Sequence, residues 1–221
     1  MSRWEIQIAL LISAGVVAIS IPPASAVESA PGVALAVLET LPVKGRAAKT
    51  GYSRGAFGQR WADVDRNGCD TRNDILKRDM TSIVYKAKTR NCVVLSGTLI
   101  DRYSGETINF VRGDVSSMEV QIDHVVALSN SWQTGAFKLS IAQRTALAND
   151  PLNLFAVKGR LNSQKSDGDA ATWLPPLKSF RCAYVAQQIA VKAKYSLWVV
   201  PPEKAAMLAI LAQCPTQEVN F

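Results

Sequence analysis

The sequence predicts a mixed α+β fold. Segments rich in β-branched and alternating apolar residues lie among segments with helical spacing, and no repeat or low-complexity tract interrupts them. The chain has 221 residues, which suits one hydrophobic core, and 48% of them are hydrophobic, as in ordinary globular proteins. We therefore expect one folded domain, over residues 52–221.

Each element follows from its local pattern. Residues 92–100 and 106–111 are expected to form a hairpin around a turn at Ser104-Gly105, because both runs are apolar or alternating. Ser140 can cap a helix that ends before Pro151, and proline at residue 201 suits the start of a last helix. The other expected segments are strands at residues 120–125 and 152–157 and helices at residues 74–86 and 180–194.

The first 26 residues have the pattern of a signal peptide. Arg3 gives a positive start, residues 6–21 are apolar, and residues 24–26 (Ala-Ser-Ala) form a cleavage site after two prolines. The short apolar run and the small-residue exit disfavour the alternative, an uncleaved membrane anchor. We expect a secreted protein with no membrane association after cleavage. Residues 27–51, rich in Ala, Val and Pro, are expected to be an N-terminal linker segment.

Export changes how the cysteines are interpreted. The chain has four, at Cys69, Cys92, Cys182 and Cys214. An even number in an exported protein predicts two disulfides, while a single histidine and the absence of a Cys-x-x-Cys pair argue against structural zinc. Three pairings are open; we favour Cys69–Cys92 and Cys182–Cys214, because each would link one end of the chain locally. Bridged thiols and one histidine also disfavour a cysteine or serine hydrolase.

The charge of the chain favours polyanionic partners. Lys and Arg number 25 against 18 Asp and Glu, which gives a net charge of +7 at pH 7. Nucleic acid is the first candidate partner, and anionic membranes or cell-wall polymers are the next. Charge alone does not separate these from a basic protein of another kind, so the motifs must decide.

The candidate catalytic residues lie around His124, the only histidine. A lone histidine is usually structural, but Asp123 precedes this one, and Asn153 and Asn162 follow nine residues apart. With these residues the chain resembles the HNH endonuclease family in its His-Asn-Asn form. Within that family it resembles a secreted bacterial branch. The resemblance begins at about residue 51 and is strongest over residues 119–176.

This resemblance implies a ββα-metal fold, with Asp123, His124 and Asn153 on a hairpin and Asn162 on a helix. It implies that His124 is the general base that activates a water molecule, and that Asp123 and Asn162 bind Mg²⁺ or Mn²⁺. Asn153 then holds the loop of His124 or orients its imidazole. Imidazole is basic near neutral pH, and hard oxygen ligands suit Mg²⁺ or Mn²⁺ better than zinc.

Residues around the motif are candidates for supporting roles. Lys165 and Arg160 are expected to contact substrate phosphate, with a solvated surface position as the alternative for each. Glu119 is expected to support the metal ligands or to orient a basic side chain. The segment between His124 and Asn153 is longer than the minimal motif requires, and it is expected to pack beside the site.

A second candidate site begins at Asp63. Its oxygen-bearing side chains resemble those of a calcium-binding loop, with glycine at the bend: Asp63, Asp65, Asn67 and Asp74. Asp70 stands where that pattern has an apolar residue, and the last ligand is Asp rather than Glu. The alternative is a turn whose side chains cap their own backbone. Arg72, in the same segment, is an alternative contact for substrate phosphate.

Two functions remain open from the sequence. The first is a secreted, metal-dependent endonuclease that hydrolyses phosphodiester bonds of DNA, with RNA as a further substrate class. The second is a non-catalytic, disulfide-linked module that binds anionic polymers with calcium. A nuclease should bring Asp123, His124 and Asn162 together around one cation, whereas a binding module need not. We expect a monomer in either case.

Overall fold

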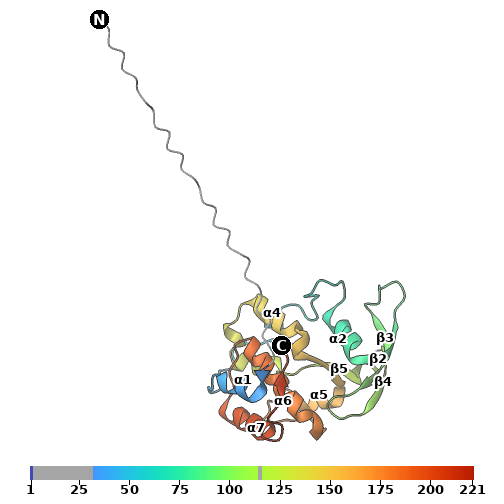
Figure 1. Cartoon of the computed structure of the whole chain (residues 1–221). Helices are drawn as coiled ribbons and strands as arrows, with labels where there is room; N and C mark the ends of the chain where they lie inside the picture. Colours follow the sequence, from blue (N-terminus) through green and yellow to red (C-terminus); the bar gives the residue numbers. More distant parts are fainter. Residues whose placement is uncertain (2–31, 114–115) are drawn as a thin grey trace.

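The computed structural model describes Met1, residues 32–113 and residues 116–221 (Figure 1). The predicted signal peptide, residues 1–26, therefore lies outside the described residues, apart from Met1. Within the described part of the chain, no helix is long and apolar enough to cross a membrane.

Helices and strands are mixed along the chain, so the predicted α+β class is confirmed. The strands are β1 (Gly32–Val33), β2 (Met80–Tyr85), β3 (Val94–Ile100), β4 (Thr107–Val111), β5 (Val120–His124), β6 (Leu154–Lys158) and β7 (Glu218–Val219). The α-helices are α1 (Ala34–Thr40), α2 (Thr71–Asp79), α3 (Leu128–Gln133), α4 (Ile141–Asn149), α5 (Gly159–Lys165), α6 (Arg181–Lys194) and α7 (Pro201–Leu211). Short 3-10 helices are η1 (Arg54–Phe57), η2 (Ser116–Met118), η3 (Ala136–Lys138), η4 (Pro151–Asn153) and η5 (Lys178–Phe180).

The strands pair in three small antiparallel sheets. β2, β3 and β4 form one sheet in sequence order, β5 pairs with β6, and β1 pairs with β7. Figure 1 shows the three-stranded sheet and α2 at one end of the molecule, and α1, α6 and α7 at the other. The hairpin expected over residues 92–111 is present as β3 and β4.

The helix expected over residues 74–86 is only partly present. Asp70 caps α2 by accepting a hydrogen bond from the backbone N–H of Asn73, so the helix begins earlier than expected. It ends at Asp79, and the chain continues directly into β2, which pairs with β3. The apolar and β-branched residues of the second half therefore form a strand, because a partner strand lies beside them.

The candidate site is built on β5, β6 and α5. β5 and β6 are antiparallel, with Asp123 opposite Phe155 and His124 opposite Leu154. The helix α5 begins at Gly159, directly after β6. A Cβ atom at this position would lie 1.9 Å from the carbonyl oxygen of Met118, so glycine allows the helix to start close to the chain before β5. The long segment between the two strands holds α3 and α4.

The described part of the predicted linker, residues 32–51, is not a linker. β1 pairs with β7 near the C-terminus, and α1 buries Ala34 and Leu38 in the core cluster that contains α6 and α7. The Ala- and Val-rich composition suggested a linker, but some of these apolar residues form the buried face of the short helix α1. The folded domain therefore includes these residues.

The structure contains two disulfide bonds, as predicted. Cys69 is bonded to Cys92, which connects the segment before α2 to the segment before β3. Cys182 is bonded to Cys214, which connects α6 to the end of the chain after α7. All four cysteines are bridged, so the favoured pairing is confirmed.

Candidate active site

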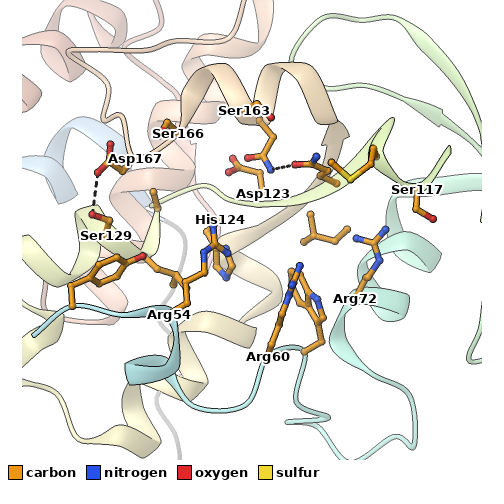
Figure 2. A pocket seen from close by; sticks show the side chains of 18 of the residues that line it. Arg54, Arg60, Arg72, Ser117, Asp123, His124, Ser129, Ser163, Ser166 and Asp167 are labelled. Atoms are coloured by element: carbon orange, nitrogen blue, oxygen red, sulfur yellow. Dashed lines mark hydrogen bonds between the residues drawn. The ribbon is translucent and has the colours of Figure 1, made fainter. Parts of the chain in front are cut away.

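A basic pocket of about 880 Å³ lies beside β5 and α5 (Figure 2). Its cationic side chains come from segments before β5: Lys49, Arg54, Arg60, Arg72 and Arg112. Its acidic side chains are Asp123 and Asp167. Figure 2 shows Arg54, Arg60 and Arg72 on the side of the β5 strand away from α5, and Ser163 and Ser166 on the α5 side. The excess of positive charge in this pocket favours a polyanionic ligand.

His124 ends β5 and lines this pocket. Its Nε2 atom lies 2.9 Å from the carbonyl oxygen of Ala148. A carbonyl oxygen can only accept a hydrogen bond, so Nε2 carries the proton and the lone pair is on Nδ1. Burial, together with the positive charges of Lys165, Arg54 and Arg60, lowers the pKa of His124 to about 4, against the opposing effect of the Ala148 bond. The imidazole is therefore neutral at neutral pH.

Trp61 fixes one side of the imidazole. The two rings are nearly parallel, with an interplanar angle of 11° and centroids 6.0 Å apart. The Arg60 guanidinium lies 5.3 Å from the centroid of the Trp61 ring, within cation–π distance. A side chain far from the motif in sequence therefore orients the candidate base.

Asp123 is buried in the adjacent position, with both carboxylate oxygens hydrogen-bonded. Tyr103 donates its hydroxyl proton to Oδ2 at 2.5 Å, and Lys165 donates from Nζ to Oδ1 at 3.0 Å. Burial raises the pKa of Asp123, while Lys165 and Tyr103 oppose that rise. Each oxygen keeps a second lone pair and can accept a further partner.

Lys165 is placed differently from our expectation. Its side chain is 0% exposed, and its Nζ also donates to the backbone carbonyl of His124 at 2.8 Å. A phosphate cannot reach an ammonium that is enclosed in this way without breaking the ion pair. The expected phosphate contact therefore does not fit the structure; the position of Lys165 near the end of α5 makes it a buried partner of Asp123.

Asn162 lies one helical turn before Lys165 and lines the pocket. Its Nδ2 donates to the Oε1 atom of Gln121 on β5 at 2.8 Å. With this amide orientation, Oδ1 of Asn162 remains an acceptor that no described donor contacts. Asp123 and Asn162 thus bring two hard oxygen donors to one pocket.

Asn153 is fully buried between the strands and the loop after β5. Its Oδ1 accepts from the backbone N–H of Val126 at 2.8 Å, and its Nδ2 donates to the carbonyl oxygens of Val126 and Leu147. Its own carbonyl accepts from the N–H of Val125. This is the arrangement expected if Asn153 holds the loop of His124.

Arg160 and Glu119 are not brought into the pocket. Both are exposed, and neither belongs to the residues that line it. The contact of Glu119 with α5 is through its backbone carbonyl, which accepts from the N–H of Gly159. Their positions therefore do not support the expected roles, which were substrate binding for Arg160 and support of the metal ligands for Glu119.

The first part of the expected calcium loop, residues 63–68, is a turn capped by its own side chains, and Asp74 lies in α2. Asp63 accepts hydrogen bonds from the backbone N–H groups of Asn67 and Gly68, and Asp65 also accepts from Asn67. Across the described parts of the chain, no group of three or more His, Cys, Asp or Glu side chains is arranged to hold a metal ion. Asp63 and Asp65 thus cap the backbone of this turn, as in the alternative that the sequence left open.

Sequence reasoning missed most of the pocket wall. Arg54, Arg60 and Arg112 have no local signal, because they reach the site only through tertiary structure. Arg72, considered as a phosphate contact, does line the pocket, and its Nη2 donates to the carbonyl of Val120 at 3.3 Å. Burial and the charges of Arg112 and Arg60 lower the pKa of Arg72.

Residues 70–210 match the family described as GmrSD restriction endonucleases, C-terminal domain. The chain belongs to this family. The match spans β5, β6 and α5, so the family shares the part of the chain that carries Asp123, His124, Asn153 and Asn162. An uncharacterized secreted protein of Arthroderma benhamiae is 35% identical over 197 residues, which cover 88% of each chain. No solved structure matches the chain.

Proposed function

We propose that this protein is a secreted, metal-dependent endonuclease of the HNH type that hydrolyses phosphodiester bonds of DNA. The observation that carries the proposal is the neutral imidazole of His124 in a pocket with five cationic side chains. Membership in a family named for restriction endonucleases supports this reaction class. The antiparallel β5–β6 pair followed by α5 has the order of elements that a ββα site requires.

His124 is the proposed general base. A neutral imidazole whose Nε2–H is held by Ala148 can take a proton from the attacking water on Nδ1. The arginines around it bind the phosphate and compensate the charge that develops in the transition state. Lys165 holds the backbone carbonyl of His124 and Asn153 holds the N–H of Val126 two residues later, so the backbone that carries the base is fixed.

The oxygen donors of the pocket fit Mg²⁺ or Mn²⁺. Asp123 and Asn162 would hold the ion, with waters and substrate oxygens in its other positions, as is common for Mg²⁺. The donor set has one carboxylate and one amide and contains no thiolate, which suits a hard cation. When bound, the ion would act as a Lewis acid that neutralises charge on the phosphate.

Export is proposed on three observations. The first 26 residues have a signal-peptide pattern, both disulfides are of the kind that persists in oxidising compartments, and the relative in Arthroderma benhamiae is named as secreted. The calcium-dependent binding module has no comparable support, since the side chains of its loop cap their own backbone.

The test is cleavage of supercoiled plasmid by the purified protein with Mg²⁺, Mn²⁺ or EDTA. We expect nicking with metal, none with EDTA, and loss of at least about 100-fold in rate for His124→Ala, the typical contribution of a general base. Circular dichroism must show that the variant is folded. Full metal-dependent activity in folded His124→Ala would refute the assignment of the base.

The contribution of the pocket charge is tested separately. Arg54→Ala should weaken DNA binding and reduce the slope of log affinity against log salt by about 1. Lys178→Ala is the matched control, because it removes one exposed positive charge outside the pocket. Equal effects of the two substitutions would show that the pocket is not the DNA-binding surface.

A further inference from the structure

A second, smaller pocket of about 160 Å³ adjoins His124. It shares five lining residues with the basic pocket: Arg54, Arg60, Trp61, His124 and Leu128. A ligand whose phosphate lies in the basic pocket can therefore extend into the smaller one past the candidate base. Nothing in the proposed reaction uses this second space.

The smaller pocket has the size and walls of a site for one aromatic ring. Phe57, Leu128 and Ala148 supply apolar surface, and Gly55 and Gly58 complete this part of the lining. Apolar cavities of about 150 Å³ admit a six-membered aromatic ring. The described structure thus places a ring-sized apolar space beside the larger basic pocket.

Asn149 adds a polar group to this lining. Its side chain is buried, and its Nδ2 donates to the carbonyl oxygens of Thr145 and Gln59, at 2.9 and 3.3 Å. Both partners can only accept, so the amide orientation is fixed and Oδ1 must be the remaining acceptor. No described group donates to Oδ1. Oδ1 is closed to a water-sized probe, so a ligand in the pocket reaches it only if the surrounding side chains move.

We propose that the smaller pocket binds the base of a nucleotide adjacent to the phosphodiester bond that is cleaved. This rests on the proposed nuclease function and adds a specificity site to it. Every nucleobase has a flat aromatic ring, which matches the size and the apolar walls of this pocket. A base can enter only after it leaves the helical stack, so the site favours single-stranded or locally unpaired DNA.

The cleavage test uses single-stranded oligonucleotides in which one abasic residue is moved stepwise through the sequence. We expect one position, next to the cleaved bond, at which loss of the base lowers kcat/KM by about 5- to 150-fold, the range of one stacked base. Cleavage that is independent of the abasic position would overturn the proposal while leaving the nuclease function intact.

A pocket-filling variant identifies the position in the protein. A Cβ atom on Gly55 would meet only the Ser53 hydroxyl oxygen at 3.7 Å, so Gly55→Leu adds a side chain at the pocket without a backbone clash. Gly45→Leu is the matched control, because that glycine also has open space and lines neither pocket. Only Gly55→Leu should remove the abasic penalty; its persistence in folded Gly55→Leu would contradict the assignment.

A binding test without catalysis separates the two proposals. In EDTA, cytidine 5′-monophosphate should bind the full protein about 5- to 150-fold more tightly than ribose 5-phosphate, which lacks the base. Isothermal titration calorimetry with Gly55→Leu and Gly45→Leu should show that only the former removes this difference. Equal binding of the two phosphates would refute the base site. Selective binding by a protein that cleaves no nucleic acid would support the base site and refute the nuclease.

Discussion

Replacing Lys165 with methionine tests whether a buried ion pair holds the candidate site together. The Lys165 side chain is 0% exposed, that of Asp123 is 4% exposed, and their closest atoms are 3.0 Å apart. At an effective dielectric constant of about 20, two unit charges at this distance attract by about 5 kcal/mol. Desolvation offsets much of this, but removing one partner leaves the other buried and unpaired. We therefore expect Lys165→Met to lower the free energy of unfolding at neutral pH by about 3–5 kcal/mol.

The pH dependence of this loss has a definite sign. Burial raises the pKa of Asp123 and Lys165 opposes the rise, so the variant has a still higher Asp123 pKa. The unfolded value is about 3.9. A group with a raised pKa in the folded state stabilises the fold below its unfolded pKa, and that contribution is lost as the pH rises through the folded pKa. The variant should therefore lie closer to wild type at about pH 4 than at about pH 7.

The assay is urea unfolding followed by tryptophan fluorescence, with EDTA present so that no metal contributes. The double variant Asp123→Asn/Lys165→Met should be more stable than the sum of the single effects predicts, by about 0.5–3 kcal/mol. Lys178→Met is the control for loss of an exposed lysine. If Lys165→Met unfolds like wild type and loses only nuclease activity, Lys165 contacts substrate and our assignment is wrong.

Three further predictions concern the free energy of unfolding. Asn153→Leu should lower the free energy of unfolding in urea by about 1–3 kcal/mol, because the Val126 N–H loses its hydrogen-bond partner. An unchanged urea midpoint would show that the loop after His124 does not depend on Asn153. Because burial lowers the pKa of His124 to about 4, the metal-free fold should lose about 3 kcal/mol between about pH 6.5 and pH 4 relative to His124→Gln; parallel pH profiles would contradict this. Cys69→Ser/Cys92→Ser removes a disulfide between residues 23 apart in sequence and should lower the free energy of unfolding by about 3 kcal/mol under non-reducing conditions. An unchanged free energy of unfolding would mean that this bond does not restrict the unfolded chain.

Local sequence signals were enough for much of the fold. Ser140 and Gln143 form a reciprocal capping box at the start of α4, and proline opens α7, as local chemistry predicts. The pattern around residues 94–111 also fixes a hairpin, because its turn and both strands are close in the chain. Such features depend on neighbours within a few residues.

Other features depend on partners that the local pattern does not contain. Residues 80–85 form β2 because β3 lies beside them, and the N-terminal segment folds because α6 and α7 cover α1. The candidate site has the same division. Asp123 and His124 are adjacent in sequence and could be found there, whereas Trp61 and Tyr103 reach them only through tertiary structure.

The basic residues show most directly why a count of charges cannot assign roles. Lys165 and Arg54 carry the same charge and lie near the same imidazole, and both lower the pKa of His124. Lys165 is enclosed, so its charge is committed to Asp123 and to the end of β5. Arg54 is exposed at the pocket, so its charge is available to a phosphate. Burial, which follows from packing over the whole chain, thus decides that Lys165 forms an internal ion pair and that Arg54 is accessible to a ligand.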